Sequence, residues 1–237
     1  MEYVAKFEKI DGVVCRFDTR IYLGSFHRSE RSICVGAIVG KNPGSASPAQ
    51  LGVLTQLELR GDKMLPTVGN RFRTAYELAD KPVPRNAFVR VWNLFYVCDK
   101  DLRQAAERAS QLGSPPVCSS EQDTVPLVWF GWGGDDAKLN LFKQRFIKRA
   151  YPVAFFYDHR VRKVVGHAPT QTDFAKHTQG MPEAPITGHL SRLLRAHLPL
   201  TTQSSGRATR AAVFGCYARV RTSRACSVTQ HPSKVTP

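Results

Sequence analysis

One polar loop carries the residue types that could do chemistry. An apolar run from Ile33 to Val39 ends at Gly40-Lys41-Asn42-Pro43-Gly44-Ser45. The glycines let the backbone approach a ligand closely, and Pro43 pushes Asn42 toward an extended conformation. A fixed amide can orient a water molecule or the edge of a base through hydrogen bonds, although it cannot take up a proton. We predict that Asn42 is catalytic and that Gly40, Lys41, Pro43, Gly44 and Ser45 contact substrate.

A plainer interpretation makes this loop an ordinary strand-to-helix turn with Asn42 as the helix cap. Ser47 followed by Pro48 weakens that interpretation, since these residues are themselves a favoured helix start. Two further apolar runs end in polar or glycine-rich residues, at Asn93 and at Gly131-Trp132-Gly133-Gly134. The carboxyl ends of parallel strands meet at one edge of a sheet, so we expect Asn93 and Trp132 beside Asn42.

Other chemistries have weaker support in the sequence. A phosphate-binding Gly-x-x-x-x-Gly-Lys-Ser/Thr loop, a Gly-x-Gly-x-x-Gly fingerprint and a Gly-x-Ser-x-Gly elbow are all missing. The seven histidines show no tight cluster, and the six cysteines form no Cys-x-x-Cys pair. We therefore expect no metal, no cofactor and reduced, structural cysteines. What remains is a reaction in which water needs positioning more than deprotonation, such as cleavage of an N-glycosidic bond.

Charge and hydropathy narrow the choice of partners. The 237-residue chain has a net charge of +15, which suits contact with the phosphates of nucleic acid or of a nucleotide. No apolar run reaches the roughly 18–20 residues of a membrane helix, and the first residues lack a signal-peptide pattern. We expect a cytoplasmic protein without a membrane partner.

The elements that must position these residues alternate between strand and helix. This alternation predicts an α/β fold, a three-layer domain with a mainly parallel four-stranded central sheet, in residues 1–198. Residues 1–30 are expected to form an edge hairpin that turns at Asp18-Thr19, and residues 199–237 a basic, disordered tail. The expected central strands are 32–39, 87–95, 125–132 and 153–157, the last continuing at 162–165, and the expected helices are 48–59, 70–78, 99–112, 135–150 and 188–197.

The Gly40-Lys41-Asn42-Pro43-Gly44 loop resembles the first motif, Gly-x-Asn-Pro-Gly, of the uracil-DNA glycosylase superfamily. Gly69-Asn70-Arg71-Phe72 resembles the Asn-Arg/His-Phe element of its mismatch-specific and single-strand-selective branches. The resemblance implies that Asn42 positions the water and that Asn70 and Phe72 bind substrate. The second motif, His/Asn-Pro-Ser, has only Gly166-His167-Ala168-Pro169-Thr170 as a degenerate match, which makes His167 a candidate.

Residues 13–190 also resemble an uncharacterised bacterial and phage family, a domain of unknown function. Its marks are an Asn-Pro-Ser-x-Ala-type loop, a Val-x-Asn-Leu-Phe strand end, a Trp-Gly turn and a late Gly-x-Pro-x-x-Pro loop. The matching residues are 42–46, 91–95, 131–133 and 180–185. This resemblance implies a fold and a site position but no reaction.

Three functional hypotheses follow. The first is a glycosylase-like hydrolase that binds a nucleobase or nucleotide and cleaves an N-glycosidic bond in DNA with an Asn42-positioned water. The second is a non-catalytic nucleic-acid-binding protein, such as a phage or plasmid accessory factor, in which charge provides the affinity. The third is an enzyme that acts on a free nucleotide or another small metabolite.

Overall fold

The computed structural model describes residues 1–197 except 28, 45–49 and 60. All of them belong to a compact unit, residues 1–199, and the second unit, residues 200–237, lies outside the described part. The strands are β1 (Glu2–Ile10), β2 (Val13–Tyr22), β3 (Ile33–Gly40), β4 (Leu54–Gln56), β5 (Ala87–Asn93), β6 (Val128–Phe130), β7 (Ala154–Asp158) and β8 (Lys163–Val165). The helices are α1 (Met64–Leu78), α2 (Leu102–Gln111), α3 (Asn140–Ile147) and α4 (Glu183–His197), with short 3-10 turns η1 (Ser119–Gln122) and η2 (Ala137–Leu139).

The strands form one mixed sheet in the order β4-β1-β2-β5-β3-β6-β7-β8. Four neighbouring strands, β5, β3, β6 and β7, run parallel, and each corresponds to one of the central strands that the sequence predicts. The α/β class is therefore confirmed. The prediction of a mainly parallel four-stranded sheet is wrong, because antiparallel strands extend the sheet at both sides of the parallel four.

The amino-terminal hairpin differs from the prediction. It joins β1 and β2 through Asp11 and Gly12, whose φ angles of +47° and +83° suit a tight hairpin turn. The expected turn at Asp18-Thr19 lies inside β2, where Thr19 pairs with Val91 of β5. The hairpin is not at the edge, since β2 pairs with β5 and β1 pairs with β4.

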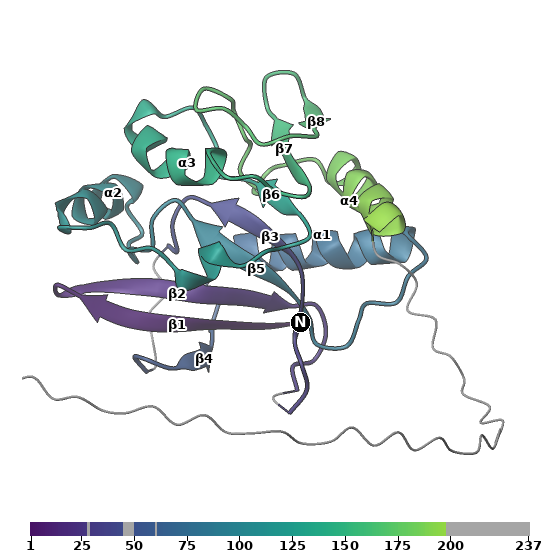
Figure 1. Ribbon diagram of the computed structural model, residues 1–237, viewed down its shortest axis with the longest axis horizontal. Helices are drawn as coiled ribbons and strands as arrows, with labels where there is room; N and C mark the ends of the chain where they lie inside the picture. The colour runs from purple at the N-terminus through teal and green to yellow at the C-terminus, as the bar shows by residue number, and fades with distance from the viewer. Residues whose placement is uncertain (28, 45–49, 60, 198–237) are drawn as a thin grey trace, which may run out of the picture. The chain divides into compact units, whose positions relative to one another are not determined.

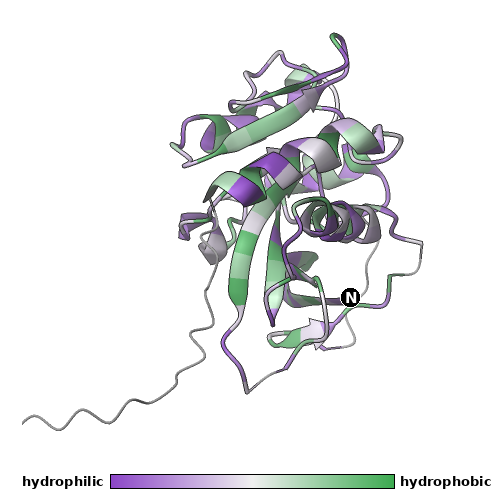
Figure 2. Cartoon of the chain, turned by 90° about the vertical axis from the view of Figure 1, so that its right-hand side faces the viewer, coloured by the Kyte–Doolittle hydropathy of each residue, from purple (hydrophilic) through white to green (hydrophobic). Residues whose placement is uncertain are grey.

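The helices cover both faces of the sheet (Figure 1). On one face α1 and α4 lie side by side, and their apolar residues share a core with β3, β5 and β7. On the other face α2 and α3 pack through residues such as Ala105, Ala109, Phe142 and Phe146 onto Trp92 and its neighbours. Figure 2 shows largely hydrophobic strands beside helices in which hydrophilic and hydrophobic residues alternate. The three-layer arrangement follows from these two cores.

Several helix boundaries were predicted wrongly. Residues 50–59 hold no helix, and Leu54–Gln56 instead pairs with β1 at the sheet edge; residues 45–49 lie outside the described part. Helix α1 begins at Met64 and not at Asn70, because Asp62 accepts hydrogen bonds from the first N–H groups of the helix. Helix α4 likewise begins at Glu183, inside the expected loop 176–188.

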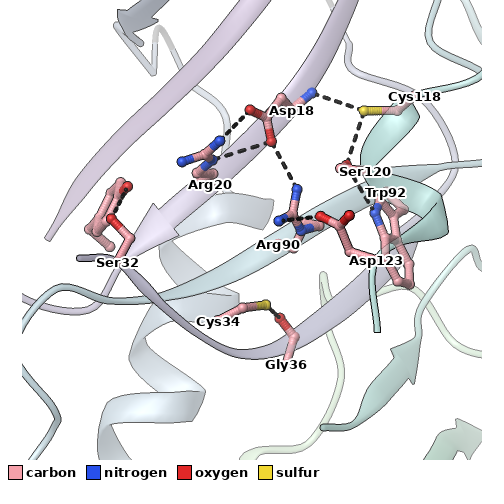
Figure 3. Close-up of polar contacts among 11 residues, drawn as sticks. Asp18, Arg20, Ser32, Cys34, Gly36, Arg90, Trp92, Cys118, Ser120 and Asp123 are labelled. Atoms are coloured by element: carbon pink, nitrogen blue, oxygen red, sulfur yellow. Dashed lines mark hydrogen bonds and ion pairs between the residues drawn. The ribbon is translucent and has the colours of Figure 1, made fainter. Parts of the chain in front are cut away.

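A polar network fixes β2 against β5 (Figure 3). The Asp18 carboxylate pairs with Arg20 and with Arg90 of β5, and Arg90 also pairs with Asp123 at 2.9 Å. The backbone N–H of Asp18 donates to Cys118 Sγ, which ties the strand to the turn before β6. These bonds fix the register of β2 at Asp18, two residues after Arg16.

Candidate functional site

The strand order determines where a ligand can enter. In the sheet, β5 and β6 are the two neighbours of β3. After β3 the chain forms β5 on one side of it and then passes over to form β6 on the other side. Ligands of open α/β sheets bind beyond the carboxyl ends of the strands at such a reversal. The loop after β3 and the turn after β6 flank this reversal, so the predicted Asn42 loop and the Gly131–Gly134 turn lie on the expected side of the sheet.

A cleft of about 440 Å³ opens there. Its volume lies in the range of small-molecule sites, roughly 300–1,000 Å³. Its wall combines the loop after β3, the segment before α1, one residue of β2 and the loop before α4. The lining residues are Arg16, Asn42, Pro43, Gly44, Leu57, Glu58, Leu59, Gly61, Asp62, Lys63, Met64, Leu65, Lys100, His177 and Gln179.

The Asn42 side chain is held in one orientation. Its Nδ2 donates to the carbonyl oxygen of Asp99 at 2.9 Å. The loop itself is anchored because the N–H groups of Leu94 and Phe95 donate to the carbonyl oxygens of Gly40 and Lys41. With the amide nitrogen bound to backbone, Oδ1 of Asn42 is left as a hydrogen-bond acceptor in the cleft wall. It can accept from a water molecule or from the N–H edge of a base.

Arg16 is a site residue that the sequence analysis missed. It lies on β2, its N–H donates to Tyr96 O, and only 2% of the residue is exposed. Among the described residues, no acceptor is bonded to its guanidinium, and its Nε is fully buried. Burial lowers the Arg16 pKa, and the nearby Asp62 charge opposes this only in part. A charged residue inside the apolar run Val13-Val14-Cys15-Arg16-Phe17 was the signal in the sequence.

Lys41 and His177 meet at the turn after β6. A Cβ on Gly133 would lie 3.0 Å from His177 Cβ and 3.5 Å from Lys41 Cε, so this position requires glycine, and its φ is +66°. Burial lowers the pKa of both Lys41 and His177, and the Lys41 charge lowers that of His177 further. His177 Nδ1 accepts from the Gln179 N–H at 3.2 Å. With Nδ1 as an acceptor, the neutral form of the ring carries its proton on Nε2, which is then a hydrogen-bond donor.

Asn93 lies beneath the cleft wall. It is fully buried, and neither polar atom of its amide has a partner in the described part of the chain. A Cβ on Gly40 would come within 3.2 Å of Asn93 Oδ1 and 3.3 Å of Met64 Sδ. Gly40 is thus required for close packing at the strand ends. Asn93 is near the cleft but does not line it.

The other predicted site residues lie elsewhere. Trp132 is fully buried and packs edge-on against Phe130 at 5.2 Å between ring centroids, so its faces belong to the core. Phe72 is also fully buried, on the inner side of α1, while Asn70 is exposed on the same helix. Because α1 begins at Met64, residues 70–72 lie in its second turn and beyond, away from the cleft-lining first turn.

His167 follows β8, the outermost strand on one side of the sheet. It is exposed, makes an edge contact with Phe156, and borders a separate hollow that includes Ala154, the first residue of β7. That hollow is at the amino end of β7, whereas the cleft is at the carboxyl ends of β3 and β5. Ser45, the last predicted contact, lies outside the described residues.

In the described ranges, no group of three or more histidine, cysteine or acidic residues is arranged to hold a metal ion. Cys15, Cys34, Cys98 and Cys118 are free thiols. Over the same ranges, none of the helices combines the length and the apolar character that crossing a membrane requires. Compared with known protein families, curated proteins and solved structures, the chain matches none.

Proposed function

We propose that the cleft binds a nucleobase or nucleotide and that Asn42 positions a water molecule to hydrolyse an N-glycosidic bond. The observation that carries the proposal is the Asn42 amide, whose nitrogen is fixed by Asp99 O while its oxygen remains an acceptor in the cleft wall. A preoriented acceptor can hold water in line with a sugar carbon without reorganising during the reaction.

The reaction needs no protein base. The C1′–N bond breaks and its electron pair leaves with the base, which gives C1′ cationic character. The oxygen of the Asn42-bound water then bonds to C1′, and the proton that this water loses neutralises the departed base. Neutral His177, through its Nε2–H, can donate a hydrogen bond to a ligand oxygen or nitrogen. The resemblance to uracil-DNA glycosylases makes a base in DNA the first substrate to test.

A free nucleotide is the second candidate, and a specific observation favours it. The cleft has the volume of a small-molecule site, and its Arg16 is almost wholly buried, whereas a duplex backbone follows exposed basic surface. A non-catalytic nucleic-acid-binding role would depend on surface charge and would not require an oriented Asn42.

The test measures base release by chromatography from oligonucleotides with uracil, hypoxanthine or mismatches, and from the corresponding free nucleotides. Asn42→Ala removes the acceptor, and Asn70→Ala is the matched control, an exposed asparagine outside the cleft. We expect release by the wild type, a loss of about 100-fold or more in Asn42→Ala, and wild-type rates in Asn70→Ala. Absence of release from every substrate, or equal release by Asn42→Ala, contradicts the proposal.

A further inference from the structure

Arg16 differs from other inward-facing arginines of the sheet and its covering helices. Arg90 pairs with Asp18 at 3.0 Å and Asp123 at 2.9 Å, and Arg145 pairs with the buried Glu121 at 3.0 Å. Arg16 has no such carboxylate partner, although it is more buried than Arg90 and Arg145. A buried charge without a partner is costly, so a positively charged side chain is expected to persist there only where something else balances it.

Glu58 and Asp62 are the two carboxylates of the described cleft wall, and no ion pair joins either of them to Arg16. The Asp62 charge acts on Arg16, but Asp62 Oδ1 accepts from the N–H groups of Met64 and Leu65 at the start of α1, at 2.8 and 3.3 Å. Asp62 influences Arg16 through space without a hydrogen bond to it. The guanidinium fork is therefore available to a ligand in the cleft.

The surroundings of Arg16 favour an oxyanion at the end of a ligand. Lys63 and Lys100 line the same cleft and add two cations to the guanidinium. Glu58 and Asp62 add two carboxylates, so the cations are in excess by one. Guanidinium groups bind phosphate and carboxylate through two parallel N–H···O bonds. Because Arg16 is only 2% exposed, a phosphate monoester at the end of a ligand can reach its guanidinium, whereas a phosphodiester must continue on both sides of the phosphate.

We propose that the cleft binds the terminal phosphate monoester of a mononucleotide, with Arg16 as the anion-binding residue at its buried end. This inference rests on the proposed function, because it names the substrate class of the same cleft. The base and the C1′ atom would then lie toward Asn42, and the phosphate toward Arg16. A nucleotide inside a DNA strand lacks a terminal monoester and would not satisfy Arg16 in this way.

The experiment is titration calorimetry of the full chain with inorganic phosphate, with uridine and inosine 5′-monophosphates, and with the two nucleosides. Succinate provides the carboxylate arm, and a short oligonucleotide without terminal phosphates provides the phosphodiester arm. Arg16→Met removes the charge at similar length. Arg103→Met is the matched control, since its side chain is largely exposed on α2 and outside the cleft. Lys100→Met tests the cleft without altering a buried position.

We expect a 5′-monophosphate to bind at least about 30-fold more tightly than its nucleoside, and Arg16→Met to lose that advantage while Arg103→Met keeps it. Lys100→Met should weaken the monophosphate about 3- to 10-fold, which tests the site even if Arg16→Met does not fold. Equal binding of nucleoside and monophosphate, or preference for succinate or for the phosphodiester, overturns the proposal.

The same data separate this inference from the proposed function. Arg16-dependent monophosphate binding without base release would contradict the hydrolysis and leave the phosphate site in place. Asn42-dependent base release from oligonucleotides that is unchanged in Arg16→Met would support the hydrolysis and overturn the phosphate site.

Discussion

Replacing Arg16 with methionine should stabilise the ligand-free protein, contrary to the usual effect of a substitution in the core. The residue is 2% exposed, and no described residue accepts a hydrogen bond from its guanidinium. Methionine fills a similar volume and carries no charge that must be kept from water. Removing the unbalanced cation therefore recovers desolvation free energy, whereas the apolar neighbours keep most of their contacts.

The expected gain is about 1–2 kcal/mol, the lower part of the range for replacing buried ionic groups, because the cleft lets water reach part of the guanidinium. For a domain of this size, that corresponds to a rise in Tm of roughly 2–8 °C. Thermal unfolding followed by circular dichroism in phosphate-free buffer measures it. Phosphate must be left out, because an anion bound to Arg16 would stabilise only the wild type.

Arg145→Met is the matched comparison. It removes the cationic partner of Glu121, which is 3% exposed at the side chain and would keep only the hydrogen bond from the Tyr96 hydroxyl. We expect that variant to lose about 3–5 kcal/mol. If Arg16→Met were destabilised to a similar extent, the Arg16 guanidinium would have a structural partner, and the inference of an anion site would fail.

Three further predictions concern the cleft. Gly133→Ala should lower the free energy of unfolding in urea by about 2 kcal/mol more than Gly134→Ala does. Both glycines have positive φ angles, but only at Gly133 would the new Cβ meet His177. Equal losses in the two variants would contradict this packing. The His177 pKa is lowered in the folded protein, so protons bind the unfolded chain more readily below about pH 6.5. Stability should therefore fall as the pH drops from 7.5 to 5.5, and less steeply in His177→Gln; parallel curves would refute the shift. Asn70→Ala should leave the affinity for 5′-monophosphates within about twofold of wild type in calorimetry, and a larger loss would place Asn70 in the cleft.

The parallel strands were predictable because their burial on two faces leaves a continuous apolar run in the sequence. The hairpin was not, although its Asp11-Gly12 dipeptide is a typical turn signal and lies between alternating strands. The predicted turn was placed at Asp18-Thr19 instead. Asp18 does adopt a positive φ, of +45°, but β2 continues through it because β5 supplies pairing partners on the far side. Tertiary pairing thus overrode a local turn tendency.

The position of the site was predictable from the strand ends, but its side chains were not. Asn42 lines the cleft, and its catalytic role stays a prediction. Asn93 and Trp132 also end strands, yet each points into a core, since the direction of a strand-end side chain depends on the local pleat. Asn70 and Phe72 were displaced from the cleft by the early start of α1, which a cap at Asp62 determines.

The antiparallel hairpin explains how a β2 residue reaches a site made by parallel strands. Because β2 runs antiparallel to β5, its first residues lie beside the carboxyl end of β5, where Arg16 N–H donates to Tyr96 O and Cys15 bridges Val97. The hairpin therefore adds a wall to the strand-end cleft that the four parallel strands alone could not provide. Arg16 on β2 and Asn42 after β3 thus reach the cleft from two strands of opposite direction and contribute a guanidinium and an amide to its wall. A ligand that is anionic at one end and bears a hydrogen-bonding group at the other satisfies both residues at once.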